Sequence, residues 1–196
     1  MKRLLPSLLY LTGAVAVVLG TIFPLWRVLL YFPQYPEGPL QVVAFAGALR
    51  GDLSEIEILN HYIGVAMPTN IPELQIMPPL LYGVAGLAVV AALVRSRPGL
   101  WLKGATMGFM AGSGVWAMYR INKYLTDFGS NPDPGAPLAG LMEPFKPPLI
   151  GKAVIVQVEA AAGFLWGTWF LAAAALLFLA GFIISRKHLK EVSSHE

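Results

Sequence analysis

The feature that most constrains this chain is an apolar stretch from Leu4 to Phe32, about 29 residues long, whose only charged side chain is Arg27. About 20 apolar residues are enough for a helix to cross the hydrocarbon core of a bilayer. The stretch is too long for the apolar region of a secretory signal peptide, and no small-residue cleavage site follows it. We therefore predict a retained transmembrane helix, which Pro24 should kink or end.

Composition extends this prediction to the whole chain. Apolar residues make up 56% of the 196 residues and charged residues only 13%, which is outside the range of an ordinary soluble domain. Apolar segments predict spans over residues 4–32, 79–94, 100–119 and 160–184. The predicted fold class is an all-α membrane protein, with residues 1–196 forming a single integral membrane domain. Its four transmembrane helices leave two long loops, residues 33–78 and 124–159, which we expect to fold into a cap.

The charges are segregated along the chain, which predicts its orientation. The two long loops carry nine of the eleven acidic residues, while eight of the fourteen basic residues lie on the side of both termini and the short turn between the second and third spans. By the positive-inside rule, both termini face the cytoplasm and both long loops face outward. Because the net charge of +3 is not pooled in one region, we expect a lipid bilayer as partner and no nucleic acid.

A polar and aromatic segment of the first loop holds the only histidine outside the C-terminal tail. Asp52 and Glu55 have the spacing of a capping box, which predicts that a helix begins there and continues to Gly64. Residues 40–49, directly before it, predict a strand. On the helix, Glu57 and His61 are four residues apart and share the side that is not apolar. This polar side is the predicted partner-binding surface, formed by Glu57, Asn60, His61 and Tyr62; an ordinary surface helix is the alternative.

The same loop offers a candidate metal site. Imidazole and thioether groups together suit Cu(I), so His61 and Met67 are the candidate ligands and copper is the candidate metal. Their spacing matches no established metal motif. The chain has no cysteine and no readable arrangement of nucleophile, base and acid, so we do not expect an enzyme.

Glycines at four-residue spacing predict close packing between helices. Small residues at this spacing let two helix backbones approach each other, so we predict that the third and fourth spans are in contact. The ionisable residues nearest to the hydrocarbon on the outer side are Arg27 and Glu159, which we expect either to pair or to extend toward the headgroups. The glycines concerned are Gly104, Gly108 and Gly112 on the third span, and Gly163 and Gly167 on the fourth.

Three runs of the loops resemble one known family. They are YPEG at 35–38, LNHYIG at 59–64, and DPGAP at 133–137 followed by PFKPPLIG at 144–151. Together they are similar to the NosB kind of small bacterial membrane proteins, whose genes lie beside atypical nitrous oxide reductase. The resemblance covers roughly the whole chain, although Val65 stands where a methionine is expected after Gly64. It implies an accessory of anaerobic respiration at the outward face of the bacterial cytoplasmic (inner) membrane.

Three functions remain compatible with the sequence. The first is a non-enzymatic accessory that docks a periplasmic or membrane respiratory protein and serves nitrous oxide reductase maturation or electron supply. The second is a structural subunit of a larger respiratory membrane complex, and the sequence does not separate it from the first. The third is a small metal conduit or transporter, whose path would be lined by Thr106, Ser113, Glu159 and Thr168.

Overall fold

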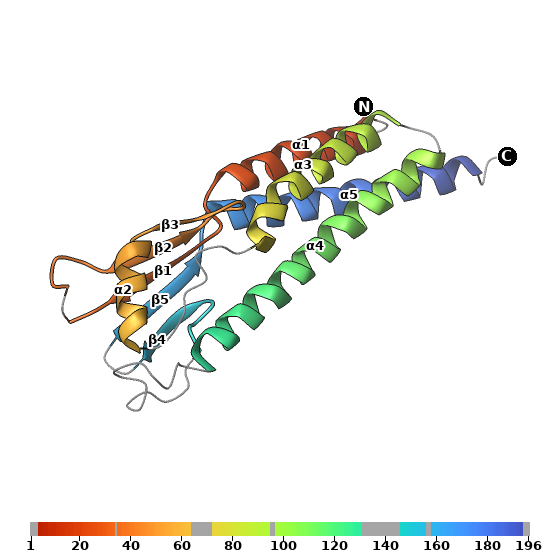
Figure 1. Ribbon diagram of the computed structural model, residues 1–196. Helices are drawn as coiled ribbons and strands as arrows, with labels where there is room; N and C mark the ends of the chain where they lie inside the picture. Colours follow the sequence, from red (N-terminus) through yellow and green to blue (C-terminus); the bar gives the residue numbers. More distant parts are fainter. Residues whose placement is uncertain are drawn as a thin grey trace.

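The computed structural model describes residues 4–33, 35–63, 72–94, 97–130, 146–155 and 158–193. Helices α1, α3, α4 and α5 form a bundle, and five strands with α2 form a domain at one end of it, which we call the sheet domain (Figure 1). The opposite end, where α1 begins and α5 ends, is called the terminal end. The elements in chain order are α1 (Leu5–Ile22), β1 (Trp26–Tyr31), β2 (Leu40–Ala44), β3 (Leu49–Gly51), α2 (Leu53–Ile63), α3 (Pro72–Leu93), α4 (Arg97–Ser130), β4 (Gly151–Ile155), β5 (Val158–Phe164) and α5 (Trp166–Ser193).

Three helices of the bundle are long and apolar enough to cross a membrane. They are the segments Leu5–Ile22 of α1, Leu74–Leu93 of α3 and Trp166–His188 of α5. Their length and composition identify the chain as a membrane protein. The third predicted span, residues 100–119, lies within α4, which is not among these candidates because Lys103 and several glycines lower its hydropathy.

The first predicted span is helical only in its first part. α1 ends at Ile22, because Pro24 disfavours helical geometry at the preceding residue, and Phe23 is extended with φ −82° and ψ 152°. The residues that follow form β1 instead of a second half of the helix. Their aromatic and branched side chains, with Trp26 and Tyr31 at the two ends, suit a strand.

The fourth predicted span also begins in a strand. Residues 160–164 belong to β5, and α5 begins only at Trp166. The sequence of β5 is rich in alanine, a strong helix former, but its backbone pairs with β1 on one side and β4 on the other. The all-α fold class is therefore confirmed only in part, because the mostly helical chain also contains, among its described residues, an antiparallel sheet of five strands in the order β3-β2-β1-β5-β4.

The remaining boundaries also differ from the predicted ones. α3 begins at Pro72 and runs through Pro78 and Pro79, and α4 is one helix that continues to Ser130. The predicted strand 40–49 is a hairpin of β2 and β3, while the helix predicted after Asp52 is confirmed as α2. The cap is not built from the two loops alone, since β1 and β5 come from segments that were predicted as spans.

The sheet domain is a direct continuation of two bundle helices. α1 leads into β1 and β5 leads into α5, and the two helices pack on each other as the two strands do. At the junction, the Leu25 carbonyl accepts hydrogen bonds from the Thr168 hydroxyl at 2.7 Å and from the Leu165 N–H at 2.9 Å. The Gly167 N–H donates to the Pro24 carbonyl at 2.8 Å. These bonds hold the sheet domain in one orientation relative to α1 and α5.

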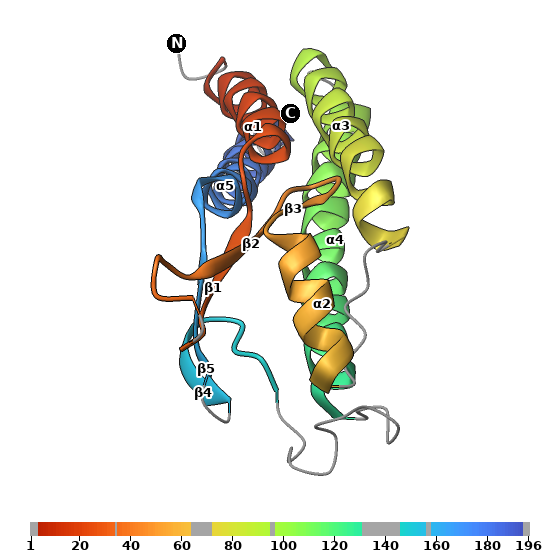
Figure 2. The same cartoon turned by 60° about the vertical axis from the view of Figure 1, so that its left-hand side comes forward.

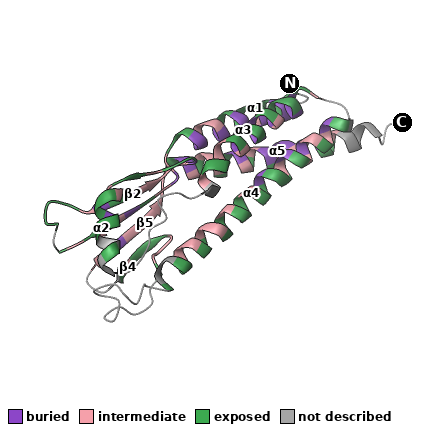
Figure 3. Ribbon diagram, in the orientation of Figure 1, coloured by how far each residue is buried: buried purple, intermediate pink, exposed green. Residues whose placement is uncertain are grey.

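The bundle core also reaches into the sheet domain. α1 packs on α3 and α5, and α4 packs on the same two helices. Tyr10 is fully buried, with its ring 5.1 Å from that of Phe178 and its hydroxyl donating to the Lys103 carbonyl at 2.8 Å. Ala46, in the turn between β2 and β3, is buried in the same cluster, so this turn rests on the end of the bundle. Buried positions are absent from the described part of α4 beyond Met110, where the helix runs past the bundle (Figure 3).

Candidate functional site

The sheet has one covered face and one uncovered face. On the covered face, Val28, Val42 and Ala160 are at most 7% exposed, and Ile56 of α2 packs against them at 3%. Figure 2 shows α2 and α4 on this side of the sheet, with the other side turned away from both. Alternation along the strands places the side chains of β1 at 27, 29 and 31 on the uncovered face.

Asp52 fixes α2 to the sheet. Its carboxylate accepts a hydrogen bond from the Gln41 N–H at 2.8 Å, and its own N–H donates to the Gln41 carbonyl at 2.9 Å. The capping-box spacing predicted the start of the helix correctly. The described hydrogen bond of the Asp52 carboxylate, however, is with the Gln41 N–H of β2. α2 is thus attached at its first turn by hydrogen bonds and along its buried side by Leu53 and Ile56.

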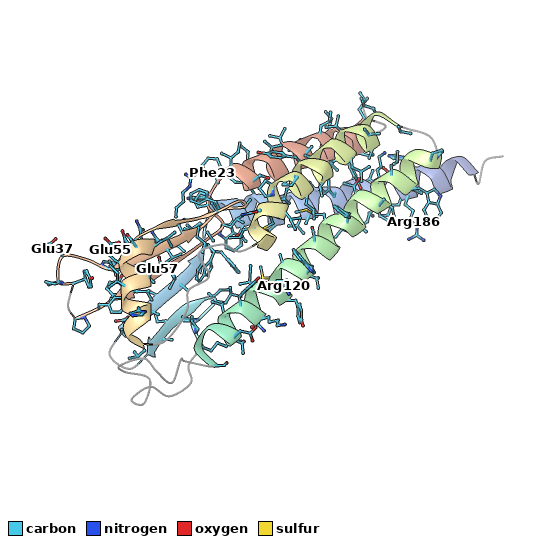
Figure 4. All side chains as sticks on the ribbon, in the orientation of Figure 1. Phe23, Glu37, Glu55, Glu57, Arg120 and Arg186 are labelled. Atoms are coloured by element: carbon cyan, nitrogen blue, oxygen red, sulfur yellow. The ribbon has the colours of Figure 1, made fainter. Side chains whose placement is uncertain are left out.

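The other side of α2 forms the candidate docking surface, which consists of Ser54, Glu57, Ile58 and His61. All four side chains are exposed, and Figure 4 shows Glu57 on this helix. The prediction that Glu57 and His61 share the exposed side is confirmed. Ile58 is 61% exposed between them and was not among the residues predicted for this surface. Its position three residues before His61 would have identified it, because residues three apart on a helix share a face.

The remaining residues predicted for this site are only partly described. Asn60 and Tyr62 lie on α2, but their side chains, and all of Gly64 and Met67, lie outside the described residues. Among the described residues, no group of three His, Asp or Glu side chains could hold a metal ion. Copper binding by His61 and Met67 therefore stays a prediction.

The glycine pattern predicted helix contacts correctly at one position only. An added Cβ at Gly104 would meet the Phe182 ring of α5 at 3.2 Å, so α4 and α5 do approach each other there. An added Cβ at Gly108 or Gly112 would meet nothing within 4 Å. Gly163 lies in β5, and Gly167 packs against the junction of α1 and β1 instead of α4. The predicted contact fails beyond Gly104 because α4 diverges from α5 toward the sheet domain (Figure 1).

Of the two alternatives expected for Arg27 and Glu159, the structure does not show the first, pairing with each other. Both lie on the uncovered face, but in the register Glu159 is opposite Tyr31, four residues beyond Arg27. Glu159 instead binds Lys152, with 2.9 Å between the carboxylate oxygen and Nζ. This hydrogen bond, followed by the charge of Glu159, raises the pKa of Lys152. Arg27 and Glu159 both belong to strands, so neither side chain lies on a helix near the hydrocarbon.

The polar groups considered for a conduit bind the backbone. The hydroxyls of Thr106, Ser113 and Thr168 donate to carbonyls of Leu102, Met110 and Leu25 at 2.7–2.9 Å. Glu159 lies in the sheet domain, outside the bundle. These four residues therefore do not form a polar path along the bundle.

A second uncovered surface lies on α4. Its residues recur at intervals of three and four, so they share one helix face. Val115 is 72% and Tyr119 is 65% exposed, next to the open space at Gly108 and Gly112. We call these four residues the α4 stripe.

Comparison with known proteins does not narrow the function. A scan against models of protein families finds no match. A search of curated proteins also finds none. The candidate sites are therefore judged on their geometry, which offers two exposed surfaces suited to macromolecular contact: one on α2 and one on α4.

Proposed function

We propose that this protein is a non-enzymatic membrane accessory that docks a periplasmic or membrane respiratory protein through the exposed side of α2. The observation that carries the proposal is Ile58, which is 61% exposed between Glu57 and His61. Protein–protein interfaces combine an apolar centre with a polar rim, and this side of α2 offers both kinds of side chain. The opposite side of α2 is fixed to a sheet that continues two membrane helices, so the surface is held in place before a partner arrives.

The proposal includes a four-span topology with both termini in the cytoplasm. From Trp166 to Arg186, α5 rises about 30 Å, which matches the hydrocarbon thickness. Trp166 is 69% exposed at the sheet end, where an interfacial tryptophan is expected, and the exposed Arg186 and Lys187 lie near the terminal end. Figure 4 labels Arg186 there, far from the sheet domain. α4 packs beside two apolar helices. In the proposed topology it crosses the membrane with them.

The topology is tested with single cysteines, because the natural chain has none. Ser130→Cys, at the sheet end of α4, should react with a membrane-impermeant thiol reagent added to whole cells with a permeabilised outer membrane. Lys187→Cys should react only after the inner membrane is opened. The reverse pattern would place α2 in the cytoplasm and rule out a periplasmic partner.

The resemblance to the NosB kind of protein supplies the setting, which is respiration on nitrous oxide. In that setting His61 is the candidate copper ligand of the docking surface, with Glu57 one helical turn away. The direct test is a pull-down from native membranes with wild type and with Ile58→Asp and His61→Ala. Both variants should insert normally, lose the partner and slow growth on nitrous oxide. Gln41→Ala, an exposed substitution on the uncovered face, is the matched control and should behave as wild type.

The α4 stripe favours a second candidate function, a structural subunit of a larger respiratory complex. An uncovered helix face with two glycines can accept a helix from another subunit. Gly108→Leu would then release redox subunits that co-purify with the wild type, while leaving the α2 surface intact. Retention of every co-purifying protein by Gly108→Leu, together with their loss in Ile58→Asp, would favour the accessory over the subunit.

A further inference from the structure

Two arginines share one row of the uncovered face. In the register of the sheet, Arg27 of β1 lies opposite Val43 of β2, and Val43 lies opposite Arg50 of β3. Residues in one row of an antiparallel sheet point to the same face. Both arginine side chains are exposed, and their backbones are about 10 Å apart across the single intervening strand.

This row lies close to the end of the bundle. Arg27 is two residues beyond Leu25, the junction residue that binds α5, which corresponds to about 7 Å along a strand. The guanidinium of Arg50 lies 4.8 Å from the centre of the Phe45 ring, in the turn whose Ala46 is buried in the bundle core. Arg50 therefore extends toward the bundle and not away from it.

α1, the helix that leads into β1, ends in exposed apolar side chains. Ile22 is 58% and Phe23 is 42% exposed at the last turn of α1, as expected where a helix leaves hydrocarbon. The headgroup layer beyond the hydrocarbon is about 5–8 Å thick on each side of a bilayer. With the hydrocarbon ending at the last turn of α1, the arginine row would be at the height of this layer. It lies on the side of the sheet that α2 and α4 do not cover (Figure 2).

We propose that Arg27 and Arg50 bind the phosphates of anionic phospholipids beside α1 and α5, at the end of the uncovered face nearest to the bundle. Two positive charges without an ion pair among the described residues complement the phosphodiester, and a planar guanidinium binds its oxygens through two N–H groups. The consequence for the domain is its attachment. The end of the sheet nearest to the bundle is held at the headgroups, while α2 lies on the opposite face.

Among the described residues, Lys152 is the third cation of the uncovered face, and it differs from the two arginines in its distance from the bundle and in having an ion pair. It lies opposite Ala161, which is opposite Leu29, so its row is two residues farther from the bundle than that of Arg27. It is also bound to Glu159 at 2.9 Å. Lys152 is therefore a matched control for the effect of removing one positive charge from this face.

The test uses the full chain in a nonionic detergent, with bound lipid counted by native mass spectrometry. The protein is titrated with short-chain phosphatidylglycerol, with the phosphatidylcholine of equal chain length and with inorganic phosphate. We expect phosphatidylglycerol to bind more tightly than phosphatidylcholine and to resist competition by millimolar phosphate. Replacing Arg27 and Arg50 by glutamine should weaken phosphatidylglycerol binding about fivefold for each arginine. Lys152→Gln should leave it unchanged.

Three outcomes would overturn the proposal. Unchanged phosphatidylglycerol binding by the double variant would remove both arginines from the site. An equal loss of phosphatidylglycerol binding in Lys152→Gln would indicate diffuse attraction to charge, and equal competition by inorganic phosphate would indicate a site for a free anion.

If the double glutamine variant does not fold, the double Arg→Lys variant tests the proposal instead. It keeps both charges, so it should retain more phosphatidylglycerol binding than either single Arg→Gln variant, and a loss greater than theirs would contradict the proposal.

Discussion

Gly167 at the start of α5 lies directly against the backbone carbonyl of Phe23 at the end of α1. An added Cβ would collide with this carbonyl and would also lie 2.8 Å from the carbonyl oxygen of Pro24. Neither oxygen can move without shifting the backbone that joins α1 to β1. The junction therefore requires glycine at position 167. Through this junction the bundle positions the sheet domain.

Gly167→Ala should therefore destabilise the protein by about 1–3 kcal/mol, because the new methyl group forces the two backbones apart. The change is measured as a lower thermal unfolding temperature in detergent. Gly108→Ala is the matched control, since its Cβ meets nothing within 4 Å and alanine favours a helix over glycine. Equal stability of the two variants would mean that the junction is not closely packed.

Local chemistry made part of this fold predictable. Pro24 ends α1 as expected, Asp52 marks the start of α2, and the spacing of Glu57 and His61 places both on the exposed side. Each of these features depends on residues within one or two helical turns. The exposed Ile58 follows from the same spacing and could have been found.

The sheet could not be predicted because its decisive contacts are distant in the sequence. β5 is alanine-rich and continues into an apolar helix, so nothing local separates it from α5, and only its pairing with β1 makes it a strand. The pairing of β5 with β4 gives Glu159 its partner, Lys152, seven residues earlier in the chain. The glycine spacing failed at Gly108 for a related reason, since the direction of α4 beyond Gly104 depends on the whole bundle.

Thr168→Val should weaken the same junction through a lost hydrogen bond. Valine has nearly the shape of threonine but cannot donate to the Leu25 carbonyl, which the Thr168 hydroxyl approaches to 2.7 Å. The expected loss is about 1 kcal/mol of unfolding free energy. Thr126→Val is the control, because its hydroxyl binds Asn122 within the exposed end of α4. Similar unfolding curves for both variants would argue against the junction bond.

Tyr10→Phe should destabilise the bundle by about 1 kcal/mol, because it removes the hydroxyl that donates to the Lys103 carbonyl at 2.8 Å. The ring contact with Phe178 is kept, so the change isolates the hydrogen bond between α1 and α4. Tyr82→Phe provides the comparison, since Tyr82 is 49% exposed on α3. The measurement is the unfolding temperature of both variants in the same detergent, and a larger drop for Tyr82→Phe would contradict the prediction.

The ion pair between Lys152 and Glu159 should make the stability of the sheet domain depend on pH in the alkaline range. Because the pKa of Lys152 is raised in the folded state, the folded protein holds its proton more tightly than the unfolded chain does. The stabilisation is fully present below the pKa of an unfolded lysine, about 10.4, and is lost as the pH rises through the higher folded value. The difference in unfolding temperature between wild type and Lys152→Gln should therefore be constant from about pH 7 to 9 and shrink above about pH 10.

The lysine and glutamate side chains are 75% and 45% exposed, so this effect on stability is small and should weaken further in high salt. Glu159→Gln is the partner control and should show the same convergence with wild type. A difference that persists unchanged above the folded pKa would mean that Lys152 stabilises the strand by packing and not by its charge.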